Sequence, residues 1–164
     1  MRRILGVSAA TLLLASCGGP DAEGTIETED GDVTYSVDGD GDEVNIDMTG
    51  PDGEQVSIRS GAKSDLPDGF SVYQGATVVT SAKIDTADGN GAVVVLSTDA
   101  APGDVIAFYR EQAEAADVEI ESEITVNGMQ MIGGEGPDGL TFSASASLGD
   151  DGATTVQLTV GRGL

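Results

Sequence analysis

The densest group of side chains that could do chemistry is the carboxylate run Asp38, Asp40, Asp42 and Glu43. Alternating carboxylates can gather oxygens around Ca²⁺, a hard cation that takes several oxygen ligands. The helix-flanked calcium loop has Gly at its sixth position and Glu at its twelfth, where this chain has Glu43 and Thr49. A solvated acidic hairpin turn is therefore the simpler interpretation, and a weak Ca²⁺-binding module is kept as an alternative.

Two other motifs match functional signatures in their letters alone. Residues 134–139 read GEGPDG, but a strand-like stretch follows where a phosphate-binding helix would begin, and two carboxylates in the loop would repel phosphate. Ser60 and Lys63 have the spacing of a nucleophilic serine and its lysine, but Gly61 and its polar neighbours disfavour the helical turn that this pair needs. We interpret the first as a turn and the second as a linker.

Carboxylates are numerous enough that a hydrolase based on them is a third hypothesis. Such an enzyme needs one carboxyl group whose pKa is raised by an apolar pocket. The chain has no Trp and only three Tyr and three Phe, so a stacking platform for a sugar would be hard to build. We therefore rank this hypothesis last and expect no catalytic residues and no cofactor.

The overall composition excludes several classes of protein. The 164 residues include 29 acids, seven bases and no His, which gives a formal net charge of −22. Seven scattered bases cannot form the basic face that nucleic acids require. The absence of His excludes a catalytic His or a His-based metal site, and the single Cys excludes an internal disulfide.

Asp-Gly pairs separate short alternating stretches, a pattern typical of β-hairpins. Between residues 26 and 65 this pattern predicts an acidic β-meander and linker, with strands around 33–37, 44–48 and 56–58 and the linker at 59–65. Each strand presents only two or three apolar side chains on one face. A meander of this kind is marginal alone and needs a partner surface.

Residues 66–164 are richer in apolar side chains and predict an α+β domain. The helix is expected at 102–116, with Val105, Phe108 and Tyr109 on its buried face. The continuous apolar run 93–96 predicts a central strand covered on both faces. The order of elements predicts an antiparallel sheet with one helix packed on one face, its strands near 76–84, 92–98, 118–126, 129–132, 140–148 and 156–160.

The first residues have the organisation of an export signal. Arg2 and Arg3 precede a twelve-residue apolar run, 4–15, that is too short to span a bilayer. The run ends in Leu-Ala-Ser-Cys, which resembles the lipobox of bacterial lipoproteins. The resemblance implies that residues 1–16 are a signal peptide cut before Cys17, that the Cys17 thiol carries the lipid, and that 17–25 form a flexible tether.

The same resemblance implies a place in the cell envelope. Gly18, rather than Asp, follows Cys17, and in diderm bacteria this pattern implies export to the outer membrane. Removing Arg2 and Arg3 leaves the mature chain with a net charge near −24. Anionic head groups would repel such a surface, so we expect the lipid on Cys17 to be the only membrane contact.

A second resemblance covers residues 66–116. The stretches 66–70 (LPDGF), 73–78 (YQGATV) and 98–110 (TDAAPGDVIAFYR) resemble a type of bacterial lipoprotein domain. In that type, a Pro-Gly-Ala turn precedes a strand pair and a helix that opens with Pro and carries Val-x-x-Phe-Tyr; Gln74 stands here in place of the turn's Pro. The resemblance implies a fold and a location and assigns no active site. Together these patterns predict a non-enzymatic, lipid-anchored envelope protein with a structural or partner-binding role.

Overall fold

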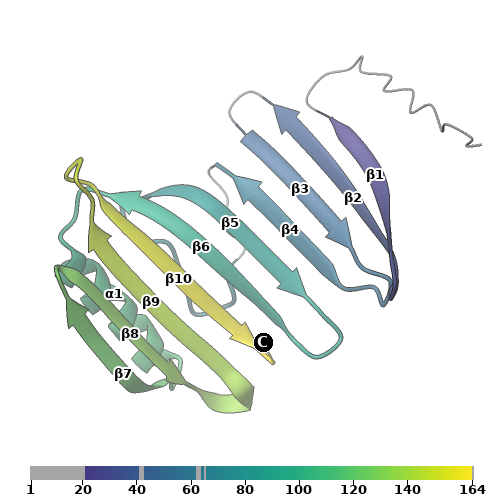
Figure 1. The fold of residues 1–164 in the computed structure, drawn as a ribbon. Coiled ribbons are helices and arrows are strands. Elements are labelled where there is room, and N and C mark those ends of the chain that lie inside the picture. Colours follow the sequence, from purple (N-terminus) through teal and green to yellow (C-terminus); the bar gives the residue numbers. More distant parts are fainter. Residues whose placement is uncertain (1–20, 41–42, 62–63, 65, 164) are drawn as a thin grey trace, which may run out of the picture.

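The computed structural model describes residues 21–40, 43–61, 64 and 66–163. Cys17, Asp42 and Lys63 lie outside these residues. Ten strands form one antiparallel sheet in the order β1-β2-β3-β4-β5-β6-β10-β9-β8-β7 (Figure 1). The strands are β1 Ala22–Thr28, β2 Gly31–Asp40, β3 Glu43–Thr49, β4 Gln55–Ser60, β5 Thr77–Asp85, β6 Asn90–Thr98, β7 Glu119–Val126, β8 Met129–Glu135, β9 Leu140–Leu148 and β10 Thr154–Arg162.

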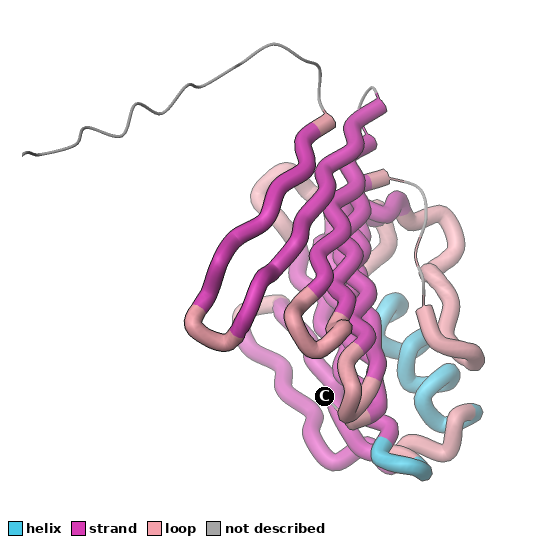
Figure 2. The backbone as a smooth tube through the Cα atoms, turned by 90° about the vertical axis from the view of Figure 1, so that its right-hand side faces the viewer, coloured by secondary structure: helices cyan, strands magenta, loops and turns pink. Residues whose placement is uncertain are grey.

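One α-helix, α1 (Pro102–Ala115), packs against the β7–β10 end of this sheet, and a short 3₁₀ turn, η1, covers Pro137–Gly139. In the view along the sheet, α1 lies on one side only (Figure 2). The expected α+β class, with an antiparallel sheet and one helix on one face, is confirmed. Pro102 begins the helix as expected, because its fixed φ suits the first turn and its missing N–H is not needed there.

The hydrophobic core lies between α1 and the strands beneath it. Val94, Leu96, Ile132 and Leu158 are fully buried there. The segment before β5 closes the core, because Phe70 stacks on Phe142 with ring centroids 5.6 Å apart. The expected helix face is confirmed for Val105 and Tyr109, which are fully buried, while Phe108 is only half-buried.

The acidic meander is not a separate unit. β4 pairs with β5 from Gln55↔Asp85 to Ser60↔Thr80, so the sheet runs without a break from β1 to β7. This pairing supplies the partner surface that the three short strands were expected to need. The expected linker 59–65 is therefore wrong at its start, because β4 continues through Ser60.

The expected tether is also too long. The sequence predicts a tether at 17–25, but Ala22–Thr28 form β1, which pairs with β2 through seven residues. Glycine and threonine gave this stretch the composition of a tether. What makes it a strand is the free edge of β2, whose backbone groups find partners in β1.

The centre of the sheet has one covering layer. β6 lies between β5 and β10, which confirms its central position. Val94 and Leu96 point into the core, whereas Val93 and Val95 are half-buried on the opposite face. The expectation that residues 93–96 are covered on both faces is wrong, because no helix or second sheet lies on that side among the described residues.

Candidate functional site

The register of the ten strands assigns every side chain to one of two faces. We call the side that packs on α1 the helix face and the other side the open face. Side chains alternate between the faces along a strand, and directly paired residues share a face. Ala82 pairs with both Ile58 and Val93, and Val93 lies on the open face, so the same row can be followed across the sheet.

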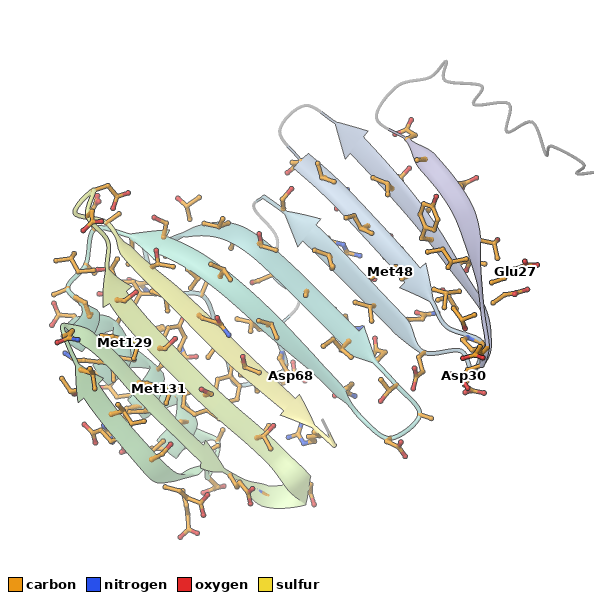
Figure 3. The ribbon with its side chains drawn as sticks, in the orientation of Figure 1. Glu27, Asp30, Met48, Asp68, Met129 and Met131 are labelled. Carbon is orange, nitrogen blue, oxygen red and sulfur yellow. The ribbon has the colours of Figure 1, made fainter. Side chains whose placement is uncertain are left out.

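The open face of strands β1–β6 is apolar. Its rows run across the sheet through direct pairs such as Val37↔Ile46↔Ile58 and Tyr35↔Met48↔Val56. Figure 3 looks onto this face, with Met48 on β3 and Met129 and Met131 at the far end on β8. The apolar residues of this region are Ile26, Val33, Tyr35, Val37, Val44, Ile46, Met48, Val56, Ile58, Ala82, Ile84, Val93 and Val95.

The charged side chains of the strands lie on the other side. Within the described strands, Glu119 and Glu135 at one corner bring charge to the open face, and Glu121, in the β7 bulge beside them, lines a shallow depression with open-face residues. The helix face of β1–β5 is polar and charged, with Glu23, Asp47 and Lys83 in one row. The remaining charged residues assigned to the helix face are Glu27, Asp32, Asp38, Glu43, Arg59, Asp85, Glu123 and Arg162. In a chain with 29 acids, this segregation leaves nearly an entire sheet face without charge.

Apolar side chains therefore change faces at β5. On the helix face the core ends at Val78 and the buried Ser81, and Arg59 is the neighbour of Ser81 in β4. On the open face the apolar rows begin at the same strand, at Ala82 and Ile84. A register bulge between Val78 and Thr80 accompanies this change. The half of the sheet that α1 does not reach thus has its apolar side turned away from the helix.

At the outer edge of the open face, an aromatic ring covers a glycine. Gly24 of β1 pairs with Tyr35 of β2, and a Cβ atom added to Gly24 would lie 2.5 Å from the Tyr35 hydroxyl oxygen. The ring therefore lies flat across β1 in the space that any larger residue would fill. Glycine at position 24 allows Tyr35 to extend the apolar face to the last strand.

The residues of the expected cation site are brought together only in part. Asp38 and Glu43 are exposed and lie in β2 and β3, at the end where these two strands join. Asp40 pairs with Glu43, and Asp42 lies outside the described residues. Among the residues that the structure describes, no group of three or more metal-ligating side chains gathers in a geometry suited to a metal ion.

The helix face of β1–β3 forms a shallow depression of about 460 Å³. Hydroxyl and carboxylate groups line it, among them Thr34, Ser36 and Asp47, and the Ser57 hydroxyl donates a hydrogen bond to Asp47 Oδ1. The depression is open to solvent and has no counter-charge among its lining residues. It offers hydrogen bonds but little burial to a small molecule.

The edge strand β7 differs from its expected pattern. Simple alternation along 118–126 predicts that Glu119, Glu121 and Glu123 form one charged face that guards the sheet edge. A bulge between Ile120 and Ser122 shifts the alternation, so Glu119 lies on the open face and Glu123 on the helix face. There the Glu123 carboxylate forms an ion pair with Arg110 of α1, with an N–O distance of 2.9 Å. The edge position of β7 agrees with the guarding role, but one of its three carboxylates binds the helix.

Sequence reasoning identified the apolar residues of β2, β3 and β4 but did not recognise them as a site. Their alternation was visible, yet which way each apolar side pointed depended on pairing with β5. One sequence signal could have revealed the open face. In each of the four N-terminal strands, the alternate positions that carry the apolar side chains include no charged residue.

A sheet that leaves one large, mostly uncharged apolar face uncovered offers a surface on which another molecule could bind. Within the described residues, no helix is both long and apolar enough to cross a membrane. A family model described as START domain-like matches residues 78–159, which is half of the chain and extends from β5 to β10. The chain belongs to this START domain-like family. Family membership suggests a ligand-binding domain. Comparison with curated proteins and with solved structures gave no significant match.

Proposed function

We propose that this protein is a non-enzymatic, lipid-anchored protein of the bacterial envelope that binds a partner through its open face. The observation that carries the proposal is the uncovered apolar region of β1–β6, flanked by a sheet half whose own apolar side is already buried under α1. Exposed apolar surfaces of this extent, with charge excluded from them, are characteristic of interaction sites.

The lipid anchor supports the same role. The lipobox resemblance proposes Cys17 as the attached residue, and β1 begins only five residues later, at Ala22. A tether this short would keep the sheet close to the membrane while the acidic surface prevents adsorption to anionic lipids. Gly18 after Cys17 favours the outer membrane as the location, if the host cell is diderm.

The proposal can be tested in cells with a photoreactive amino acid placed on either face of one strand. Val37 points to the open face and its neighbour Ser36 to the helix face, and both are half-buried. We expect light-dependent adducts, identified by mass spectrometry, from position 37 and few from position 36. The chain should fractionate with membranes, and Cys17→Ser should release it or leave it unprocessed.

Equal adduct yields from the two positions, or none from either, would refute binding through the open face. A Cys17→Ser variant that is still processed and still requires detergent would refute the anchor. The two readouts are independent, so one part of the proposal can fail while the other stands.

A further inference from the structure

The open face constrains the chemistry of whatever covers it. Its apolar region spans six strands from Ile26 on β1 to Val95 on β6 and contains no ionisable group except the Tyr35 hydroxyl. A partner that placed charged side chains here would lose their hydration and find no counter-charge. The covering surface must therefore be apolar and uncharged where it touches.

The neighbouring surface adds a second constraint. Acidic turns line one end of the apolar region, with Glu29 and Asp30 at the β1–β2 turn, Asp52 and Glu54 at the β3–β4 turn, and Asp88 at the β5–β6 turn. Anionic lipid surfaces would meet these carboxylates at the rim and be repelled. A basic partner would be drawn to the helix face, where the carboxylates of the strands lie, rather than to the open face.

The uncovered apolar face of β1–β6 is suited to pack against the same face of a second copy of the chain. β1–β4 contain no fully buried side chain among their described residues, so they form half of a layered structure. Two sheets can pack face to face about 10 Å apart, with side chains of the inner faces interdigitating. Packing through the open face also leaves both helix faces, with their charges, pointing outward into water.

The size of the apolar region suits such packing. With strands about 4.8 Å apart, a rise of about 3.3 Å per residue and about six residues along each strand, six strands cover about 600 Å² per copy. Two copies would bury about 1,200 Å², the lower end of the range for specific interfaces. Interfaces of this size with a repelling rim are expected to have dissociation constants in the micromolar range.

We infer that a second copy of this chain covers the open face, giving a symmetric dimer in which the β1–β6 regions form a two-layer sandwich. This inference rests on the open face being the binding surface, as proposed above, and names its partner. A two-fold axis brings the same patch of each copy together, so one self-complementary surface is sufficient. The two helices lie on the outer sides and do not interfere.

The test is sedimentation of the full chain carrying Cys17→Ser, which removes the lipid, from about 1 to 200 µM protein. We expect a reversible monomer–dimer equilibrium that strengthens with NaCl, because salt screens the acidic rims. Ile58→Lys on the open face should weaken the dimer at least tenfold. Ser57→Lys, the next residue on the helix face and the same change in charge, should leave it unchanged.

If Ile58→Lys fails to fold, two single-cysteine variants test the dimer by cross-linking instead. In the Cys17→Ser background, Ile46→Cys should be cross-linked into a dimer by a short bismaleimide, and the neighbouring helix-face variant Asn45→Cys should not. A monomer at all concentrations and salts, or equal effects of the open-face and helix-face variants, would overturn the inference.

Binding to neutral phosphatidylcholine vesicles tests whether a lipid surface, rather than a second copy, covers the open face. A monomer that binds these vesicles, and loses binding with Ile58→Lys, would also overturn the dimer and show that a lipid surface is the occupant. If the chain is monomeric but position 37 still forms adducts with another protein in cells, the dimer is refuted while binding through the open face stands.

Discussion

The Tyr109 hydroxyl is a buried polar group of the core. This side chain of α1 is fully buried between the helix and the sheet, and its oxygen accepts a hydrogen bond from the Tyr73 N–H at 3.2 Å. Burial raises the pKa of Tyr109 to about 12, and the hydrogen bond from Tyr73 opposes part of that rise. Because the folded pKa lies above the ordinary value near 10, the folded state holds this proton more tightly than the unfolded chain does.

We therefore expect the free energy of unfolding to be independent of Tyr109 ionisation below pH 10 and to fall as pH rises from 10 to 12. The loss should reach about 2 kcal/mol at pH 12. Tyr109→Phe removes this contribution and costs about 1 kcal/mol at pH 7 through the lost hydrogen bond. Urea unfolding of both proteins from pH 7 to 12 measures the difference. Parallel pH curves for the two proteins would contradict the assignment.

At the scale of elements, the two halves of the sheet are held together by different means. The β6, β9 and β10 strands are covered by α1 and the segment containing Phe70, and their inward side chains are buried. In the monomer, β1–β3 are held mainly by strand pairing and by partly exposed contacts on the open face. Regions with few buried apolar contacts open at lower free energy than the core.

Amide hydrogen exchange at protein concentrations near 1 µM should resolve these two halves. We expect the amides of β3 to exchange at least about 100-fold faster than those of β10, because β3 can open without disturbing the core. Ile46 and Val156 are suitable reporters in the two strands. Equal protection at both positions would mean that the sheet opens only as a whole.

For the whole molecule, repulsion between carboxylates is the main electrostatic term that opposes compaction. The formal net charge is −22, and the seven bases offset only a few of the 29 acids. Two described ion pairs, Lys83–Asp85 and Arg110–Glu123, join partly exposed side chains and contribute little each. Repulsion between the remaining carboxylates is reduced by salt, whose screening length is about 10 Å at 0.1 M.

The melting temperature should therefore rise, by about 5 °C, between low salt and a few hundred millimolar NaCl. CaCl₂ at equal ionic strength separates screening from a binding site. We expect equal rises with the two salts. An additional, saturable rise with Ca²⁺ that disappears when Asp38, Asp40 and Asp42 become Asn would instead show that the acidic turn binds the cation.

The local pattern of this chain was enough to predict most of the elements. Alternation and Asp-Gly turns predicted the strands of the meander, and Pro102 with its apolar spacing predicted the helix, because these features depend on residues close together in sequence. The exceptions are instructive. β1 lacks a strong pattern and forms because β2 offers a free edge, and the bulge in β7 moves Glu123 to the helix by shifting alternation at one residue.

The candidate site could not be predicted in the same way. The sequence by itself determined that apolar and charged residues alternate in β2, β3 and β4, and hence that one face of these strands would be free of charge. Only the tertiary structure decided which face that is. The decision is made by the pairing of β4 with β5, which puts Ile58 beside Ala82 and Ala82 beside Val93, on the side away from α1. Because side chains alternate with a period of two residues, a shift of one residue in that register would have turned the apolar side of β1–β4 toward the helix face.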